Sequence, residues 1–160
     1  YGYLYNWAAV MNGSASSDAN PSGVQGICPD GWHVPSDAEW TELENYVSSQ
    51  SQYVCGSSTS KIAKALVSEE GWITDTDDNC AVGNNPDANN ATGFSARPAG
   101  NYYGNYFGNY YSFGLDAHFW SATQYSSYSA YYRYLYYNYA NVYRNYYYKF
   151  NGSSVRCVRD

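Results

Sequence analysis

One stretch, residues 101–151, constrains the fold of this chain more than any other. It holds 17 of the 22 tyrosines, interspersed with Asn, Ser and Gly. A packed core rarely holds so many phenols, because each buried hydroxyl requires a hydrogen-bond partner. A low-complexity tract would not normally carry Phe119, Leu135 and Val142 at strand-like spacing. Tyr, Ser, Gly and Asn together are typical of paratopes, so we interpret the stretch as a binding surface, with an amphipathic sheet and a low-complexity tract as alternatives.

Charged side chains are distributed unevenly along the 160 residues. Residues 1–100 carry 12 acidic and three basic side chains, a balance of −9, whereas residues 101–160 carry two acidic and five basic ones, a balance of +3. A nucleic-acid-binding surface needs clustered Lys and Arg, so this mildly basic region predicts no nucleic-acid partner. Stacking of single-stranded bases on the tyrosines is the weaker alternative.

The length indicates a single domain over residues 1–160, large enough to bury a core. No apolar run approaches about 18 residues, so we expect no membrane span in this chain. The sequence begins at Tyr1 with neither Met nor a signal peptide. We therefore expect a mature or trimmed form, whose upstream part could carry a lipid anchor or another domain.

The cysteines are widely spaced, at Cys28, Cys55, Cys80 and Cys157, and none belongs to a C-x-x-C pair. Structural zinc sites usually contain such close pairs, so the spacing favours disulfides in an exported domain. Four cysteines allow three pairings, and their positions do not choose among them. We expect an extracellular or cell-surface location.

Residues 1–100 are interpreted as a scaffold with two helices. Ser36 and Glu39 form a capping box, and apolar side chains at three- and four-residue steps after it predict a helix over 37–48. A shorter helix is predicted over 60–67. The predicted scaffold strands cover 1–10, 32–34 and 93–100.

The tyrosine-rich region predicts a strand over 119–123 and a hairpin with arms over 131–136 and 142–148. On the first arm, Tyr132, Tyr134 and Tyr136 should share one face, because side chains alternate along a strand. Tyr131, Arg133 and Leu135 should share the other face. Residues 152–160 are predicted to form a closing strand. Runs of strands around two helices indicate an α+β domain.

Residues 71–93 form a long polar loop in which Asp75, Asp77 and Asp78 offer hard oxygen ligands for Ca²⁺. Their spacing lacks the central Gly and the final bidentate Glu of an EF-hand loop. Solvated loop carboxylates are therefore the preferred interpretation and Ca²⁺ the alternative. We expect no other metal and no cofactor.

Catalysis requires a nucleophile with a base, or a ligand cluster with an open position. The two histidines are His33, interpreted as structural, and His118, which lies in the tyrosine-rich region, where Asp116 is a lone carboxylate. No phosphate-binding Gly loop leads into a helix. The sequence predicts no catalytic residue and no enzymatic activity.

Several short segments of the sequence are more specific than its composition and point to a family. They are Leu4-Tyr5-Asn6-Trp7, the run from Gly26 to Trp40 (GICPDGWHVPSDAEW), Gly93-Phe94-Ser95 with Pro98-Ala99-Gly100, Phe119-Trp120-Ser121-Ala122-Thr123, and Ser154 to Arg159 (SVRCVR). Together they resemble the Fibrobacter succinogenes major paralogous domain family over nearly the whole chain.

This resemblance implies an exported or surface-anchored domain with a C-type-lectin-like fold, related to formylglycine-generating enzymes. Such a fold has small antiparallel sheets, two helices and long irregular loops, and its two termini meet in one sheet. The resemblance also implies that Cys28 pairs with Cys157 and Cys55 with Cys80. A bridged Cys157 cannot serve as the thiolate that the formylglycine-generating relatives need.

The tyrosine-rich region is also similar to the variable proteins of diversity-generating retroelements, which are bacterial or phage-encoded. Such systems mutate template adenines, so an AAY codon for Asn drifts to codons for Tyr, Ser, Asp, His, Phe or Gly. These residue types fill residues 101–151 outside a few islands. The resemblance implies invariant scaffold positions at Phe119, Trp120, Leu135, Val142 and Arg144.

Calcium-dependent C-type lectins hold sugar through Glu-Pro-Asn or Gln-Pro-Asp together with Trp-Asn-Asp, and none of these strings occurs here. Asn85-Pro86-Asp87 resembles these strings only weakly, so calcium-dependent sugar binding is not expected.

The sequence thus predicts a non-enzymatic, receptor- or adhesion-type binding module for an unknown protein or surface ligand, with residues 1–100 as scaffold and 101–151 as the diversified ligand-binding region. The candidate ligand-binding residues are Tyr102, Tyr103, Tyr106, Tyr110, Tyr111, Tyr125, Tyr128, Tyr132, Tyr134, Tyr136, Tyr137, Tyr139, Tyr143, Tyr146, Tyr147 and Tyr148. The alternative is a structural or glycan-binding cell-envelope domain with an undiversified aromatic surface.

Overall fold

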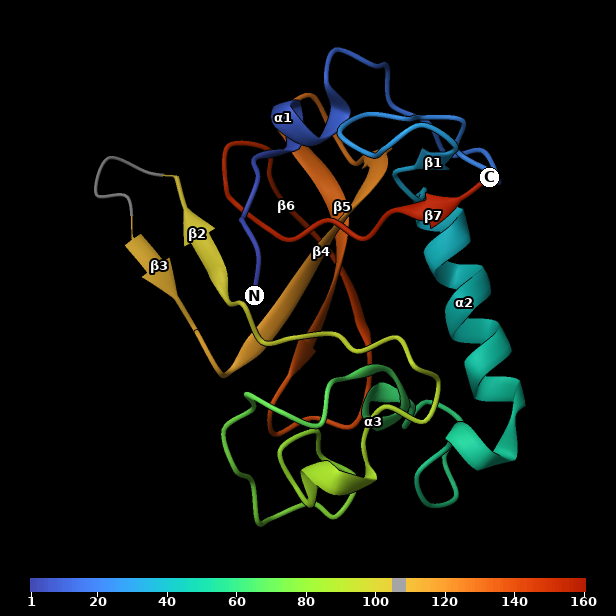
Figure 1. Cartoon of the computed structure of the whole chain (residues 1–160), viewed down its shortest axis with the longest axis vertical. Coiled ribbons are helices and arrows are strands. Elements are labelled where there is room, and N and C mark those ends of the chain that lie inside the picture. Colours follow the sequence, from blue (N-terminus) through green and yellow to red (C-terminus); the bar gives the residue numbers. More distant parts are fainter. Residues whose placement is uncertain (105–108) are drawn as a thin grey trace.

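The computed structural model describes residues 1–104 and 109–160, and a three-stranded antiparallel sheet lies at its centre (Figure 1). Strands β4 (Asp116–Gln124), β5 (Ser129–Tyr136) and β6 (Tyr143–Tyr148) follow one another in space as in sequence. The predicted hairpin is confirmed as β5 and β6, and the strand predicted over 119–123 lies within β4.

Two small antiparallel sheets flank this centre. Strand β1 (Trp32–His33) pairs with β7 (Val158–Arg159), and β2 (Asn101–Tyr103) pairs with β3 (Asn109–Tyr111). The β2–β3 ribbon projects to one side of the central sheet, and α2 (Asp37–Ser49) lies on the other (Figure 1). The small antiparallel sheets and few helices confirm the α+β class.

The capping box predicted for the long helix is present at the start of α2. Ser36 Oγ accepts a hydrogen bond from the Glu39 N–H at 3.1 Å, and Glu39 Oε2 accepts one from the Ser36 N–H at 2.9 Å. This pairing supplies hydrogen-bond partners to two backbone N–H groups that otherwise have none at the start of a helix. The predicted end at residue 48 differs from the observed end by one residue.

Two scaffold elements predicted as strands are not strands. Residues 7–11 form a short helix, α1 (Trp7–Met11), whose N-terminus is capped by the Asn6 side chain through a 2.9 Å bond from Ala9 N–H. Residues 93–100 make only isolated bridges, such as that between Ala96 and Val67. The aromatic alternation of the first segment resembled a strand, but its buried side chains recur at helical spacing.

The second predicted helix is shorter than expected. It spans α3 (Ala63–Leu66), because Val67 already has extended backbone and forms the bridge to Ala96. Two single 3₁₀ turns, η1 (Ser51–Tyr53) and η2 (Pro86–Ala88), lie in the long loops around it.

Apolar clusters lie on both faces of the central sheet. On one face Phe119 and Leu135 pack with Trp40 of α2 and with the segment around α3. On the other, Trp120 and Tyr132 pack with the residues of α1. The sheet is therefore covered by the scaffold over β4 and β5 on one face, and by the N-terminal segment on part of the second.

Both disulfides implied by the family resemblance are present. Cys28 bonds to Cys157, which ties the region before β1 to the residue that precedes β7 (Val158–Arg159), and Cys55 bonds to Cys80, which closes the acidic loop. They are consistent with an extracellular location. Within residues 1–104 and 109–160, no helix is long and apolar enough to cross a membrane.

The closing segment meets the N-terminal region less directly than the resemblance implied. Strand β7 pairs with β1, whereas among the described residues the N-terminal segment forms one β-bridge with the closing segment, between Tyr5 and Ser153. The predicted closing strand over 152–160 is regular only at β7.

Candidate ligand-binding site

The central sheet sorts the side chains of the tyrosine-rich region onto two faces. Along β5, Tyr132, Tyr134 and Tyr136 alternate with Arg133 and Leu135. Arg133 is buried against α2, where it forms an ion pair with Asp37, and Leu135 belongs to the apolar cluster of that face. The three tyrosines point the other way and line one cavity, which confirms the predicted alternation.

Aromatic rings on the cavity face stack in a row across the three strands. His118 lies 5.1 Å from Tyr132 and Tyr132 lies 5.7 Å from Tyr134, measured between ring centroids, with interplanar angles of 14° and 27°. Tyr134 stacks in turn on Tyr143 of β6 at 5.0 Å. Such contacts hold each ring in one orientation, so the surface is formed before any ligand arrives.

The β2–β3 ribbon supplies the opposite wall. Tyr103 packs edge-on against Tyr147 of β6 with centroids 5.6 Å apart, which anchors the ribbon to the sheet. Gly100, which precedes the ribbon, has φ +68°, and a Cβ there would lie 2.1 Å from the carbonyl oxygen of Tyr111. Only glycine therefore allows the chain to pass this close to the end of β3.

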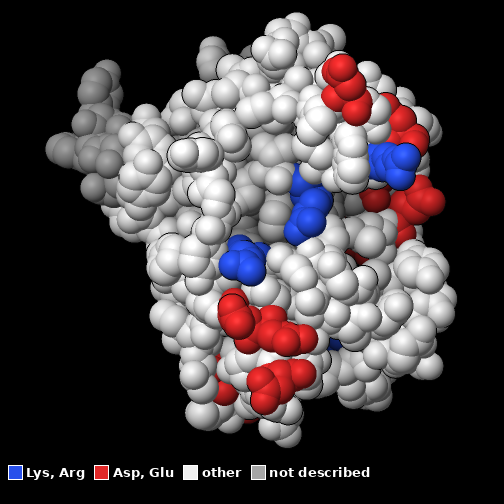
Figure 2. Space-filling view, in the orientation of Figure 1, with Lys and Arg blue, Asp and Glu red and all other residues white. Residues whose placement is uncertain are grey.

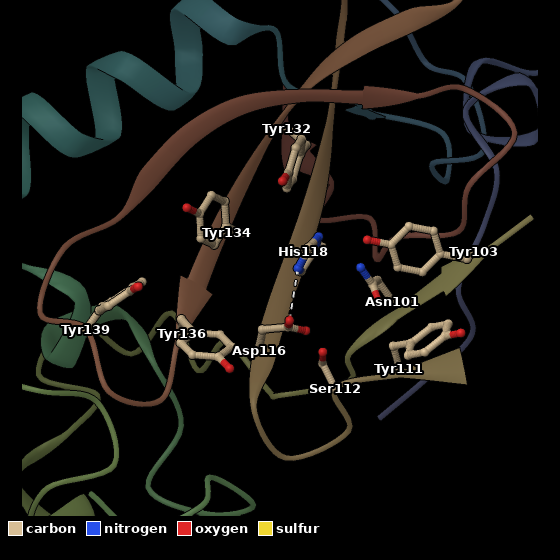
Figure 3. A pocket seen from close by; sticks show the side chains of 10 residues that line it. All are labelled: Asn101, Tyr103, Tyr111, Ser112, Asp116, His118, Tyr132, Tyr134, Tyr136 and Tyr139. Atoms are coloured by element: carbon tan, nitrogen blue, oxygen red, sulfur yellow. Dashed lines mark ion pairs between the residues drawn. The ribbon is translucent and has the colours of Figure 1, made fainter. Parts of the chain in front are cut away.

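Between the sheet and the ribbon lies an open cavity of about 660 Å³ (Figure 3). Its lining residues are Asn101, Tyr103, Tyr111, Ser112, Asp116, His118, Tyr132, Tyr134, Tyr136 and Tyr139. All ten belong to the tyrosine-rich region. The volume suits a small ligand or a side chain of a larger partner.

Polar side chains gather at the floor of the cavity. His118 Nε2 lies 3.3 Å from Asp116 Oδ2, and Asn101 donates from Nδ2 to the Tyr147 hydroxyl at 3.2 Å. Within residues 1–104 and 109–160, no hydrogen-bond partner is found for Asn101 Oδ1, Asp116 Oδ1 or His118 Nδ1. A buried polar atom without a partner costs about 1–3 kcal/mol, so this floor favours an occupant.

Burial disfavours ionisation of three of the cavity tyrosines. It is the main cause that raises the pKa of Tyr132, Tyr134 and Tyr136 above the usual 10.0. Burial and a hydrogen bond with Tyr103 likewise raise the pKa of Tyr147. At neutral pH these hydroxyls both donate and accept hydrogen bonds.

Comparison with known families identifies the chain. A family model described as the Fibrobacter succinogenes major domain matches residues 1–159. The chain belongs to this family. Searches of curated proteins and of solved structures return no match. The match confirms the family to which the sequence strings pointed, and it assigns no ligand.

In this Fibrobacter succinogenes major domain, the predicted tyrosines do not form one continuous surface. Six line the cavity. Tyr102, Tyr143 and Tyr147 are half-buried around it, Tyr137 packs against the apolar cluster near α3, and Tyr110, Tyr125, Tyr128, Tyr146 and Tyr148 are exposed. Tyr106 lies outside the described residues.

Tyr132 departs from the expected exposure. Its side chain is only 6% exposed, because it packs against Trp120 and His118. It forms a buried wall of the cavity rather than an exposed contact. The sequence placed Tyr132 on the correct face but could not show that the N-terminal segment covers that end of the strand.

A second aromatic group lies on the α2 side of the sheet. Tyr125 and Tyr146 stack with centroids 4.0 Å apart, and the guanidinium of Arg144 lies 3.9 Å from the centre of the Tyr131 ring. Arg144 also forms an ion pair with Asp37 at 2.9 Å. This group is separated from the cavity by the sheet.

The cavity contains four residues that sequence reasoning did not select: Asn101, Ser112, Asp116 and His118. The sequence contained a signal for two of these four residues. Asp116 and His118 are two residues apart, so a strand that began at Asp116 would have placed both on the face of Tyr132.

Other candidate residues have structural roles. His33 is buried between Glu39 and Asp160, each 2.6 Å from one ring nitrogen, as expected for a structural histidine. In the acidic loop, Asp75 Oδ2 accepts hydrogen bonds from the backbone N–H groups of Asp77 and Asp78. Among the described residues, no group of three or more His, Cys, Asp or Glu side chains is placed to hold a metal ion.

Charge on the face shown in Figure 2 is mixed. Acidic side chains gather over the loops near α3 and beside α2, and Lys and Arg side chains form separate patches. The net positive charge of residues 101–160 therefore does not form one continuous basic surface on this face.

Proposed function

We propose that this chain is a non-enzymatic binding module with a C-type-lectin-like fold, exposed outside the cell, and that the tyrosine-lined cavity contacts its ligand. The observation that carries the proposal is the cavity itself. Six predicted tyrosines converge on it from two sheets and the turn after β5. Stacking fixes several of their rings, so little side-chain entropy is lost on binding.

The residue types around the cavity support diversification by adenine mutation. All ten lining residues are Asn, Tyr, Ser, Asp or His, which are reachable from an AAY codon. Each of these types differs from AAY by at most one adenine change, whereas Ala117, Arg133 and Leu135 on the opposite face of the same strands require both adenines to change. The division follows the side-chain alternation of the strands, as expected if only the ligand face varies.

The test of this proposal is binding to arrays of extracellular proteins and of glycans. The labelled chain is compared with a Tyr134→Ala/Tyr136→Ala/Tyr139→Ala variant and with Tyr46→Ala, which removes an exposed ring from α2, away from the cavity. We expect a protein ligand whose binding is lost in the triple variant and kept in Tyr46→Ala. Equal binding by both variants contradicts the proposal.

Broad, weak binding to many glycans, with no protein ligand, is the other informative result. It would favour a structural or glycan-binding cell-envelope domain with an undiversified aromatic surface.

A further inference from the structure

Three unpartnered polar atoms at the cavity floor limit what the cavity can hold. Asn101, Asp116 and His118 are each 5–6% exposed, and each has a side-chain atom without a hydrogen-bond partner in the described part of the chain. Figure 3 shows these three side chains next to one another, with tyrosines around them. An occupant, or water that accompanies it, can supply the missing partners.

Two of the three atoms, Asn101 Oδ1 and Asp116 Oδ1, are hydrogen-bond acceptors. Asp116 Oδ1 is a carboxylate oxygen, and Asn101 Oδ1 is an acceptor because the amide nitrogen donates to Tyr147. His118 Nε2 lies 3.3 Å from Asp116 Oδ2, and the unpartnered Nδ1 accepts a hydrogen bond when the proton is on Nε2 alone and donates one when both ring nitrogens carry protons. An occupant that satisfies the two oxygens therefore brings hydrogen-bond donors.

Among the described lining residues of the cavity, His118 is the one side chain beside Asp116 that can carry a positive charge, and it does so only when protonated. None of these lining residues is Lys or Arg. The arginines of β5 and β6 are on the opposite face, where both pair with Asp37. Lys149 lies over the Trp7 ring, and its pKa is lowered by burial.

We propose that the cavity binds the guanidinium or ammonium group of an Arg or Lys side chain on a protein partner. This rests on the binding function proposed above and specifies its chemistry. Such a group supplies donors to Asp116 and Asn101 and the charge that a buried carboxylate requires. Tyrosine rings at the rim add a favourable site for a cation.

Alternative occupants fit less well. An anion would meet the Asp116 carboxylate directly, and a sugar would supply donors but bring no positive charge to it.

The inference is tested by NMR titration of the ¹⁵N-labelled full chain with capped amino acids. The probes are N-acetyl-arginine methylamide, N-acetyl-lysine methylamide and the neutral analogue N-acetyl-citrulline methylamide. We expect saturable shifts at amides of residues 116–118 and 132–136, with at least one cationic probe binding about tenfold or more tighter than citrulline.

Asp116→Asn, which keeps the shape of the side chain, should reduce cation binding to the level of citrulline. Asp87→Asn removes the same charge from an exposed loop site and should leave binding unchanged. Thermal unfolding of both variants verifies that they fold.

Equal binding of arginine and citrulline, no saturable shift with either cationic probe, or no effect of Asp116→Asn overturns the inference. Each of these results leaves the proposed binding function standing if the array ligand still depends on Tyr134, Tyr136 and Tyr139. If the array ligand does not depend on these tyrosines but the cationic probes still bind, the proposed function is contradicted and the cavity is a site for small cations alone.

Discussion

His118 stacks on Tyr132 across the β4–β5 pair, with ring centroids 5.1 Å apart and planes 14° apart. The two are diagonal neighbours, because His118 pairs with Tyr134 and Tyr132 pairs with Trp120. Tyr132 thereby stands between Trp120 of the apolar cluster and His118 of the cavity floor. The Tyr132 ring, together with Tyr147, which contacts both Trp120 and His118, joins the core to the candidate site.

This position predicts that Tyr132 matters more for stability than the other cavity tyrosines. Tyr132→Ala should lower the free energy of unfolding by about 3–5 kcal/mol, because it leaves a void in the core. Tyr139→Ala, whose side chain is 42% exposed, should lower it by less than about 1 kcal/mol. Urea denaturation followed by tryptophan fluorescence measures both losses. Similar losses for the two variants would contradict the buried placement of Tyr132.

The two disulfides should contribute unequally to stability. Cys28–Cys157 closes a separation of 129 residues and Cys55–Cys80 one of 25. In the chain-entropy account, the longer loop adds about 1.5 kcal/mol of stabilisation over the shorter one. Paired Cys→Ser variants of each bridge, compared by chemical denaturation, test the difference. A greater loss from removal of Cys55–Cys80 would show that loop entropy does not dominate here.

The contacts of His33 predict a stability that depends on pH. Burial alone lowers the His33 pKa, but the hydrogen bonds and charges of Glu39 and Asp160 outweigh burial and raise the pKa above 6.5. Protonated His33 is thus favoured in the folded chain, so its stabilising contribution is complete below about pH 6.5 and is lost as the pH rises through the raised pKa.

Unfolding free energies measured between pH 6 and pH 9 should therefore fall, and Asp160→Asn should flatten the decline. His33→Gln serves as the variant without a titrating ring. An undiminished slope in His33→Gln would assign the decline to another group.

Gly100 should be required for the cavity wall. Gly100→Ala places a Cβ 2.1 Å from the Tyr111 carbonyl oxygen and forces alanine to φ +68°. Strain of this kind costs about 1–3 kcal/mol, and we expect the β2–β3 ribbon to shift. Amide shifts of Tyr103 and Tyr111 should change strongly. Gly13→Ala, which has positive φ but no close neighbour, is the control. Unchanged ribbon shifts in Gly100→Ala would contradict this account of the wall.

Local signals in the sequence predicted some elements well. The capping box of Ser36 and Glu39 lies within four consecutive residues, so it defines the start of α2 without contacts from distant parts of the chain. Alternation along β5 likewise predicted which tyrosines share a face. By contrast, α1 was predicted as part of a strand. It is only five residues long, so the helical spacing of its buried side chains is a weaker signal than the aromatic alternation before it.

The cavity could be predicted only in part. That Tyr134 and Tyr136 share a face follows from strand periodicity. The burial of Tyr132 depends on where the N-terminal segment packs, and the wall formed by Tyr103 depends on how the β2–β3 ribbon turns at Gly100. Both are contacts between segments far apart in the sequence, which periodicity does not encode.

The central claim is that the cavity is a diversified ligand-binding site, and sequencing of this gene across a population of its source cells tests it most directly. The account predicts substitutions concentrated at the ten lining positions, in codons derived from AAY, while Phe119, Trp120 and Leu135 stay fixed. Sparse variation spread evenly along the chain would contradict diversification.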